Sequence, residues 1–304
     1  MDLQKYRGVI PAFYACYDEA GKFSPERARK LARKLVDKGV KGLYVGGSSG
    51  ECIYLEKEER MATLEAVMAE VKGECTIIAH VACNNTAESC ELAAHAESLG
   101  VDAIASIPPI YFHLPERSIA AYWNAMSAAA PNTDFIIYNI PQLAGVALTP
   151  SLFKEMRKNP RVVGVKNSSM PVMDLELWKR LGGEDCIVFN GPDEQFVSGR
   201  VIGAEGGIGG TYAVMVELFL RMNELVEAGR MKEAQAIQHE VNEIIVEMCS
   251  TSANMYAVAK EILRINEGVT CGSVRSPLAP LSPEDMPAVE RVAERIRKAI
   301  QQFA

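Results

Sequence analysis

The fold is decided by residues 8–47, which read GVIPAFYACYDEAGKFSPERARKLARKLVDKGVKGLYVGG. β-Branched and aromatic runs stand at both ends of this stretch, and an amphipathic segment between them opens at Ser24 and Pro25 and stops at Gly39. Serine is a common N-cap, proline suits the first helical position, and glycine ends helices. The stretch therefore predicts a strand, a helix and a second strand, which is one unit of a parallel α/β sheet.

The same alternation continues along the chain. Eight strands are expected, at residues 8–13, 42–47, 76–82, 102–107, 134–140, 162–166, 187–190 and 206–208. The helices expected between them, at residues 24–38, 57–71, 86–99, 115–130, 150–158, 172–181 and 194–202, are long enough to join parallel strands. After residue 214 the pattern is helical only, at residues 215–228, 230–248, 252–266 and 284–302.

A weak internal repeat links helix ends to the next strands, at residues 38–42, 99–103 and 202–206. Eight regular units favour a closed (β/α)8 TIM barrel over a doubly wound open sheet, which would usually carry a G-x-G-x-x-G turn after its first strand. We therefore predict an α/β fold with a barrel catalytic domain over residues 1–228. A C-terminal helical extension over residues 229–304 is expected to pack on the barrel.

Charge and hydropathy exclude two classes of partner. The net charge of -7 arises from Lys+Arg 32 against Asp+Glu 39, with no basic cluster that could follow a phosphate backbone, so we expect no nucleic-acid partner. Residues 1–6 lack the basic and apolar regions of a signal peptide, and no apolar run approaches the roughly 18 residues that a membrane helix requires. The expected location is cytoplasmic, without membrane contact.

The spacing of cysteines and histidines predicts no metal site. The eight cysteines are scattered without a C-x-x-C pair, which favours reduced and buried thiols in a chain of this size. The four histidines form no H-x-H or H-x3-H pair. We therefore expect neither disulfide bonds nor a metal.

Unusual residues stand where the strands end, which is where barrel enzymes build their active sites. Gly47, Ser48 and Ser49 stand at the end of the second strand and combine accessible backbone N–H groups with two hydroxyls, as an anion-binding cradle requires. The same residues also suit an ordinary loop. Asp193 and Glu194 follow the seventh strand, where they would either bind sugar hydroxyls or begin a helix.

The sixth strand places one lysine, Lys166, at the end of an apolar run. Burial there would favour the neutral amine, which can attack a ketone and form an imine. The alternative is a strand-end lysine that reaches solvent. Tyr138 ends the fifth strand and could relay a proton, and Tyr111 follows the fourth strand, but either tyrosine could equally be a packing residue.

With these residues in place, the whole chain resembles the N-acetylneuraminate lyase branch of the dihydrodipicolinate synthase/N-acetylneuraminate lyase family. The resemblance is carried, in the order and spacing of the family, by residues 46–51, 79–83, 138–141, 164–166, 191–194 and 206–212. It implies a class I aldolase that cleaves N-acetylneuraminate to pyruvate and N-acetylmannosamine. It also implies that no cofactor is needed, because a covalent imine forms between pyruvate and Lys166.

The resemblance further assigns roles to single residues. Lys166 would form the Schiff base, Tyr138 would relay the proton, and Tyr111 would support it, in some relatives across a subunit contact of a homotetramer. The keto acid and the sugar would be bound by Gly47, Ser48, Ser49, Ser168, Gly191, Asp193, Glu194, Gly209 and Gly210.

The sequence also departs from patterns within the family. Residues 141–145 lack the arginine with which dihydrodipicolinate synthases meet their second substrate, which weakens that alternative. Ser168 stands where the lyases usually have threonine and keeps a hydroxyl, whereas Gly210 replaces a usual serine and removes one possible hydrogen bond. Three alternatives stay open: a 2-keto-3-deoxy-sugar-acid aldolase, a dihydrodipicolinate synthase, and a non-catalytic barrel that binds a keto acid.

Overall fold

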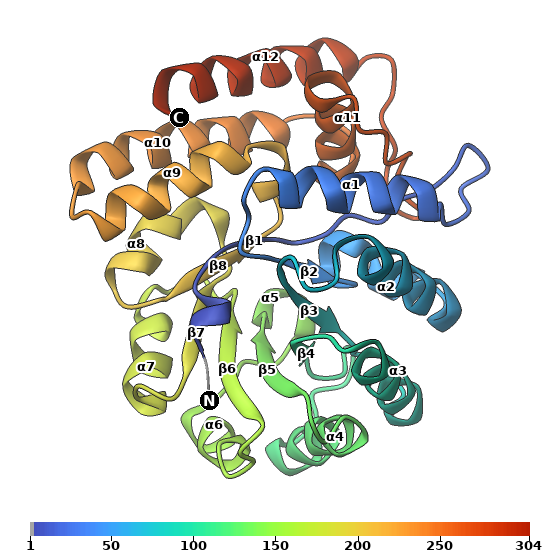
Figure 1. Ribbon diagram of the computed structural model, residues 1–304, viewed down its shortest axis with the longest axis vertical. Coiled ribbons are helices and arrows are strands. Elements are labelled where there is room, and N and C mark those ends of the chain that lie inside the picture. The colour runs from blue at the N-terminus through green and yellow to red at the C-terminus, as the bar shows by residue number, and fades with distance from the viewer. Residues whose placement is uncertain (1–2) are drawn as a thin grey trace.

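The computed structural model describes residues 3–304; Met1 and Asp2, with which the expected barrel domain begins, lie outside the described residues. Eight strands surround a central axis and helices surround the strands (Figure 1). The strands are β1 (Gly8–Pro11), β2 (Gly42–Val45), β3 (Thr76–His80), β4 (Ala103–Ser106), β5 (Asp134–Asn139), β6 (Val162–Asn167), β7 (Ile187–Asn190) and β8 (Gly206–Gly209).

All neighbouring strands run parallel, in the order β1-β8-β7-β6-β5-β4-β3-β2. The two ends of this sheet meet, because Ala12 pairs with Tyr44 and the N–H of Phe13 donates to the carbonyl of Tyr44 at 2.9 Å. The N–H of Lys41 also donates to the carbonyl of Val9, at 2.9 Å. The predicted (β/α)8 barrel is therefore confirmed.

Eight helices link successive strands or complete the ring: α1 (Pro25–Asp37), α2 (Lys57–Val71), α3 (Thr86–Leu99), α4 (Glu116–Ala129), α6 (Pro150–Met156), α7 (Met173–Gly182), α8 (Phe196–Val201) and α9 (Val216–Glu227). Ser24 caps α1 as expected, accepting a hydrogen bond from the N–H of Arg27. The internal repeat also has a structural cause, because Gly39, Gly100 and Gly203 all have positive φ where a helix turns into the next strand.

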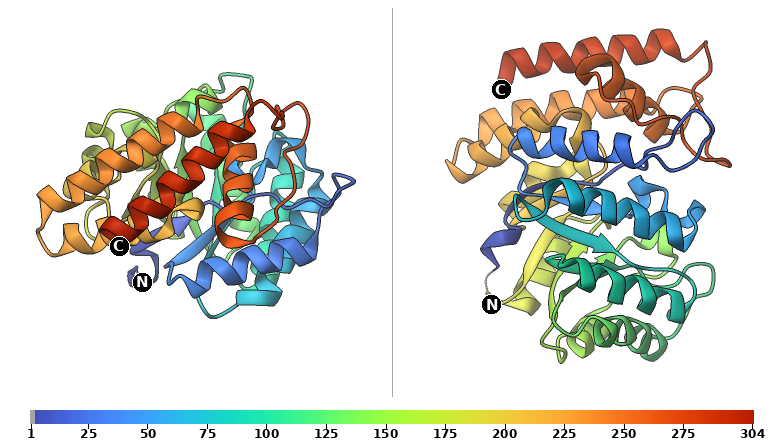
Figure 2. Two further views of the ribbon diagram at one scale, coloured as in Figure 1. Left: turned by 90° about the horizontal axis from the view of Figure 1, so that it is seen from above. Right: turned by 45° about the vertical axis from the view of Figure 1, so that its right-hand side comes forward.

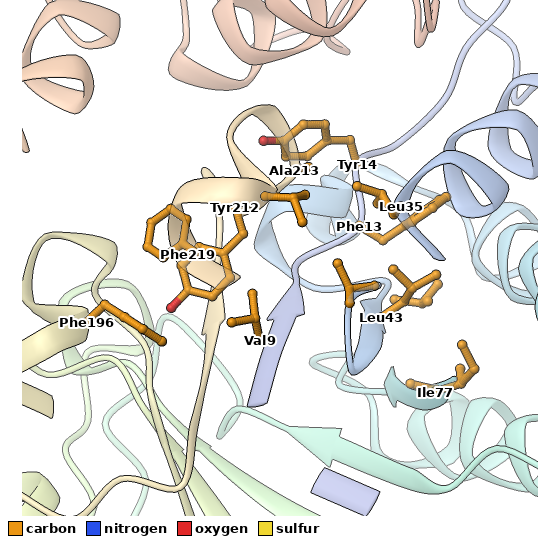
Figure 3. Packing of buried hydrophobic residues seen from close by; sticks show 14 of the residues in the cluster. Val9, Phe13, Tyr14, Leu35, Leu43, Ile77, Phe196, Tyr212, Ala213 and Phe219 are labelled. Atoms are coloured by element: carbon orange, nitrogen blue, oxygen red, sulfur yellow. The ribbon is translucent and has the colours of Figure 1, made fainter. Parts of the chain in front are cut away.

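Alternation along each strand creates two cores. The barrel interior cluster consists of Tyr6, Ile10, Tyr44, Ile78, Ala103, Ala105, Ile136, Tyr138, Val163, Ile187, Phe189 and Ile208. The larger outer core lies between strands and helices, where Val9, Leu43 and Ile77 come from neighbouring strands (Figure 3). The rings of Phe196, Tyr212 and Phe219 pack edge to face or tilted in the same layer.

A bulge interrupts the alternation in β6. Phe135 pairs with Val162, but Ile136 pairs with Gly164, so β6 has one residue more than β5 between these pairs. Val162 belongs to the outer core, and strict alternation from it would send the side chain of residue 166 outward as well. Because of the bulge, Lys166 instead pairs with Tyr138 of the barrel interior cluster.

The C-terminal helices α10 (Met231–Met248), α11 (Met255–Glu267) and α12 (Met286–Phe303) pack on one side of the barrel, with α12 outermost (Figure 2). The division of the chain at residue 228 stays a prediction. None of the helices in residues 3–304 has the length and apolar character to cross a bilayer.

Several short helices were not predicted. They are α5 (Pro141–Ala144) and the 3-10 turns η1 (Gln4–Tyr6), η2 (Ser48–Gly50), η3 (Cys52–Tyr54), η4 (Asp193–Gln195) and η5 (Tyr212–Val214). The helix expected over 194–202 is divided into η4 and α8, because Gln195 leaves helical geometry at φ -126 and ψ 27.

Candidate active site

Lys166 is buried near the carboxyl end of β6, with 5% of the residue exposed. Its Nζ lies 3.9 Å from the ring centroid of Tyr138 and 4.3 Å from that of Tyr44. Burial lowers the pKa of Lys166 from 10.5 to about 7, while attraction to Asp193 and Cys52 acts in the opposite direction. A large fraction of the amine is thus neutral at physiological pH, as a nucleophile requires.

Tyr138 is the register partner of Lys166 on β5 and is 3% exposed. Burial raises its pKa to about 12, and hydrogen bonds with the hydroxyls of Ser168 and Ser48 partly oppose this rise. The phenol is therefore neutral near pH 7. It can pass on a proton only by accepting another as it gives up its own.

The turn after β2 carries two of the predicted site residues, Ser48 and Ser49. Gly46 has φ +76, and a Cβ on Gly47 would lie 2.6 Å from the ring of Tyr44, so both glycines suit their positions. Ser48 begins η2, whose first N–H groups have no intrahelical partner. Ser49 is buried and its hydroxyl donates to the phenol oxygen of Tyr256 at 3.2 Å.

The ends of β6 and β7 lie against each other through Ser168 and Gly191. A Cβ on Gly191 would meet the Ser168 hydroxyl at 2.0 Å, and the Gly191 N–H donates to the carbonyl of Asn167 at 2.8 Å. The N–H of Ser168 donates to the carbonyl of Asn139 at 2.7 Å. The structure thus joins Ser168 both to Tyr138 and to the loop that follows β7.

Asp193 and Glu194 occupy different environments. Asp193 is 6% exposed and burial raises its pKa to about 6, opposed by hydrogen bonds from Thr211. One carboxylate oxygen, Oδ2, accepts from both the N–H and the hydroxyl of Thr211, each at 2.6 Å. The other, Oδ1, lies 2.2 Å from where a Cβ of Gly209 would be. The side chain of Glu194 is exposed.

Gly210 lies between two hydroxyls of the site. A Cβ at this position would be 3.4 Å from the Ser49 hydroxyl and 3.5 Å from the Tyr256 phenol, which are ordinary contact distances. Its carbonyl accepts a hydrogen bond from Tyr14 at 2.6 Å. The space that a serine would occupy is therefore beside Ser49 and Tyr256.

Tyr111 is the one predicted catalytic residue that this chain does not bring to Lys166. It is 86% exposed, and its ring packs edge to face on Phe112 with centroids 5.0 Å apart. Its φ of 84 is unusual for a residue other than glycine. Residues in such a conformation carry backbone strain, which the surrounding structure has to hold in place.

Several site residues were missed by sequence reasoning. Tyr44 and His80 contact Tyr138 edge to face, with centroids at 5.8 and 6.0 Å. His80 Nδ1–H donates to the carbonyl of Gly46 at 3.0 Å, and burial lowers the pKa of His80 to about 3. The Tyr44 hydroxyl and His80 Nε2 are buried without a hydrogen-bond partner in residues 3–304. Alternation within β2 could have identified Tyr44, whereas Tyr256 gave no local signal.

The described part of the chain, residues 3–304, contains no group of three His, Cys, Asp or Glu arranged to hold a metal ion. The eight cysteines are free thiols, but the expectation that they are buried holds only in part. Four of them are buried, and Cys249 is exposed.

The chain matches known proteins over nearly its whole length. The model of the Dihydrodipicolinate synthetase family matches residues 5–296. An N-acetylneuraminate lyase of Mediterraneibacter gnavus is 64% identical over 302 residues, covering 99% of this chain and 96% of that protein. One from Salmonella agona is 33% identical over 290 residues, covering 95% and 97%. A solved structure described as a Ruminococcus gnavus sialic acid aldolase catalytic lysine mutant is 63% identical with a TM-score of 0.99, covering 100% of this chain and 99% of that chain.

The barrel, the buried lysine beside a phenol and these relatives together define a carbon–carbon lyase of the aldolase class. The chain belongs to the dihydrodipicolinate synthetase family. The predicted family membership is thereby confirmed.

Proposed function

We propose that this protein is a Schiff-base aldolase that cleaves N-acetylneuraminate to pyruvate and N-acetylmannosamine. One observation carries the proposal: the buried amine of Lys166 lies 3.9 Å from the ring centroid of Tyr138 at the barrel mouth. Support for the substrate comes from the lyase that is 64% identical over nearly the whole chain. The solved relative described as a catalytic lysine mutant supports the role of a lysine.

The proposed reaction begins when the neutral amine of Lys166 adds to the C2 carbonyl of the open-chain sugar acid. Loss of water gives a protonated imine, which accepts the electron pair of the C3–C4 bond as that bond breaks. Tyr138 takes the proton of the C4 hydroxyl while donating its own to the substrate carboxylate. N-acetylmannosamine leaves, and the proton held by the carboxyl group returns to Tyr138 as Tyr138 donates its own to C3 of the enamine. Water then hydrolyses the imine to pyruvate and free Lys166.

The other predicted residues receive roles in the same proposal. The N–H groups and hydroxyls of Ser48 and Ser49, with Gly47, would bind the carboxylate of the keto acid. The sugar portion would contact Ser168, Gly191, Asp193, Glu194, Gly209 and Gly210. Asp193 accepts hydrogen bonds from both the N–H and the hydroxyl of Thr211, and burial raises its pKa, so its proposed role is mainly to shape this region. The exposed Glu194 would then bind the sugar hydroxyls.

Assembly and location complete the proposal. We propose a cytoplasmic homotetramer in which Tyr111 contacts the site of a neighbouring subunit. Its exposure and positive φ support this role. The partners are a keto acid and a sugar, with neither nucleic acid nor membrane, and the covalent imine replaces any cofactor.

The pH dependence of pyruvate release tests the amine. Imine formation needs the neutral form of Lys166, so kcat/KM should rise with pH and level off above a midpoint of about 7. Asp193 raises the pKa of Lys166 by attraction, so the Asp193→Asn variant should have its midpoint at lower pH. The profile is measured as kcat/KM for N-acetylneuraminate from pH 5 to 10; a midpoint near 10 would contradict a buried nucleophile.

Two measurements distinguish the alternative functions: whether pyruvate forms a covalent adduct, and which substrate is turned over fastest. Treating the protein with pyruvate and borohydride should reduce the imine and add a stable mass to Lys166, located by peptide mass spectrometry. A non-catalytic barrel predicts no adduct. The protein is then assayed with N-acetylneuraminate, 2-keto-3-deoxy sugar acids, and pyruvate with aspartate semialdehyde. Faster turnover of either of the last two would replace the proposed substrate; residues 141–145, which include α5, contain no cation for the semialdehyde carboxylate.

A further inference from the structure

Helix α11 contacts the turn after β2 at two points. Tyr256 and Lys260 are four residues apart on this helix and therefore lie on the same face. Tyr256 accepts a hydrogen bond from Ser49 at 3.2 Å, and the Nζ of Lys260 donates to Oε1 of Glu51 at 2.6 Å. One face of α11 thus contacts both Ser49 and Glu51, although the helix lies more than 200 residues after this turn in the sequence.

The ion pair between Lys260 and Glu51 is fully enclosed, with 1% and 0% of the side chains exposed. The second carboxylate oxygen of Glu51 accepts from the phenol of Tyr17 at 3.1 Å and from the N–H of Arg275 at 2.8 Å. Lys260 also donates to the carbonyl of Ser273 at 2.8 Å. Both charges are therefore compensated by several partners that come from separate segments of the chain.

Fold stability alone does not account for this pair. Removing two charges from water opposes their attraction, so a buried ion pair contributes little net stability compared with apolar residues of the same size. In some proteins a buried polar or ionic group instead fixes one geometry. Glu51 has φ 55 and ψ 32, a left-handed backbone conformation that residues other than glycine rarely adopt. Its N–H closes the turn by donating to the carbonyl of Ser48 at 2.9 Å. The surrounding contacts hold Glu51 in this conformation.

We propose that Glu51, Lys260 and Tyr256 are positioning residues that set the geometry of the turn carrying Ser48 and Ser49, and so determine how tightly the carboxylate of the keto acid is bound. The inference rests on the proposed function, because it assigns that carboxylate to this turn. Under this proposal α11 contributes to substrate recognition, although it is separate from the strands that carry Lys166 and Tyr138.

The test measures two quantities in the full-length protein: the pyruvate concentration that gives half-maximal borohydride trapping of Lys166, and the maximal trapping rate. Glu51→Gln removes the negative charge at nearly constant shape, and Tyr256→Phe removes only a hydroxyl. In Glu51→Gln the half-saturating concentration should rise roughly tenfold, the effect of one weakened charge-assisted hydrogen bond, with a smaller rise in Tyr256→Phe. The maximal rate should change less than about twofold, because the amine and the phenol are untouched.

Glu267→Gln is the matched control. Glu267 lies at the other end of α11 and pairs with Lys34 at 2.7 Å and Lys38 at 2.5 Å, away from the turn. A general loosening of α11 would raise the half-saturating concentration in this variant as well, and that result would overturn the inference. So would an unchanged concentration in Glu51→Gln and Tyr256→Phe; if Glu51→Gln does not fold, Tyr256→Phe decides. Failure of the wild-type protein to form any adduct would be a distinct result that contradicts the proposed function itself.

Discussion

Lys166→Ala should abolish pyruvate release from N-acetylneuraminate, lowering kcat by at least roughly a thousandfold, because no other group can form the covalent intermediate. The variant should also lose the borohydride adduct completely. Its unfolding temperature should not fall, since alanine removes an amine whose protonation the barrel interior disfavours. Steady-state kinetics, intact mass and thermal unfolding check these three expectations.

Lys41→Ala is the control for this substitution. Lys41 precedes β2 at the opposite end of the barrel, and its N–H rather than its amine takes part in the strand pairing. This variant should keep both the activity and the adduct. An adduct that persists in Lys166→Ala, on any other lysine, would show that the nucleophile had been misassigned.

Tyr138→Phe should lower kcat roughly 100- to 10,000-fold, the usual contribution of a positioned proton-transfer group. Imine formation with pyruvate should persist, because Phe preserves the ring beside Lys166 and removes only the phenol hydroxyl. The expected signature is therefore a protein that is trapped by pyruvate and borohydride but hardly cleaves the sugar acid. Stopped-flow measurement of bond cleavage, alongside trapping, separates the two steps.

Tyr6→Phe provides the matched loss of a buried phenol. Tyr6 also belongs to the barrel interior cluster, but its hydroxyl donates to Asp134 and to the carbonyl of Asp102, both at 2.8 Å, at the end of the barrel where β1 begins. Its removal should lower stability without lowering kcat. Equal losses of kcat in both variants would indicate that Tyr138 acts through packing and not through proton transfer.

The fold could be predicted from local signals. Ser24, Pro25 and Gly39 mark one helix, and comparable signals recur often enough to define the strands and the ring of helices. The strand assignments also predicted the position of the site, because the carboxyl ends of all strands in a parallel barrel lie at one mouth. Lys166, Tyr138, Ser48 and Ser49 are all of this kind.

The contacts that refine the site could not be predicted in this way. Thr211 donates two hydrogen bonds to one carboxylate oxygen of Asp193, a residue that the resemblance assigned to the sugar. Tyr256 contacts Ser49 from a helix more than 200 residues further along the chain. Both are tertiary contacts between segments distant in the sequence, and no periodicity or residue spacing predicts them. Tyr111 follows the fourth strand as expected, but its side chain is exposed in this structure.

The bulge in β6 makes the chemistry depend on an irregularity of the backbone. A regularly paired strand with the same number of residues between Val162 and Lys166 would turn the reactive amine towards the surrounding helices and carry Val165 into the mouth. Anyone grafting such a lysine onto another barrel would need to transplant the irregular backbone together with the residue.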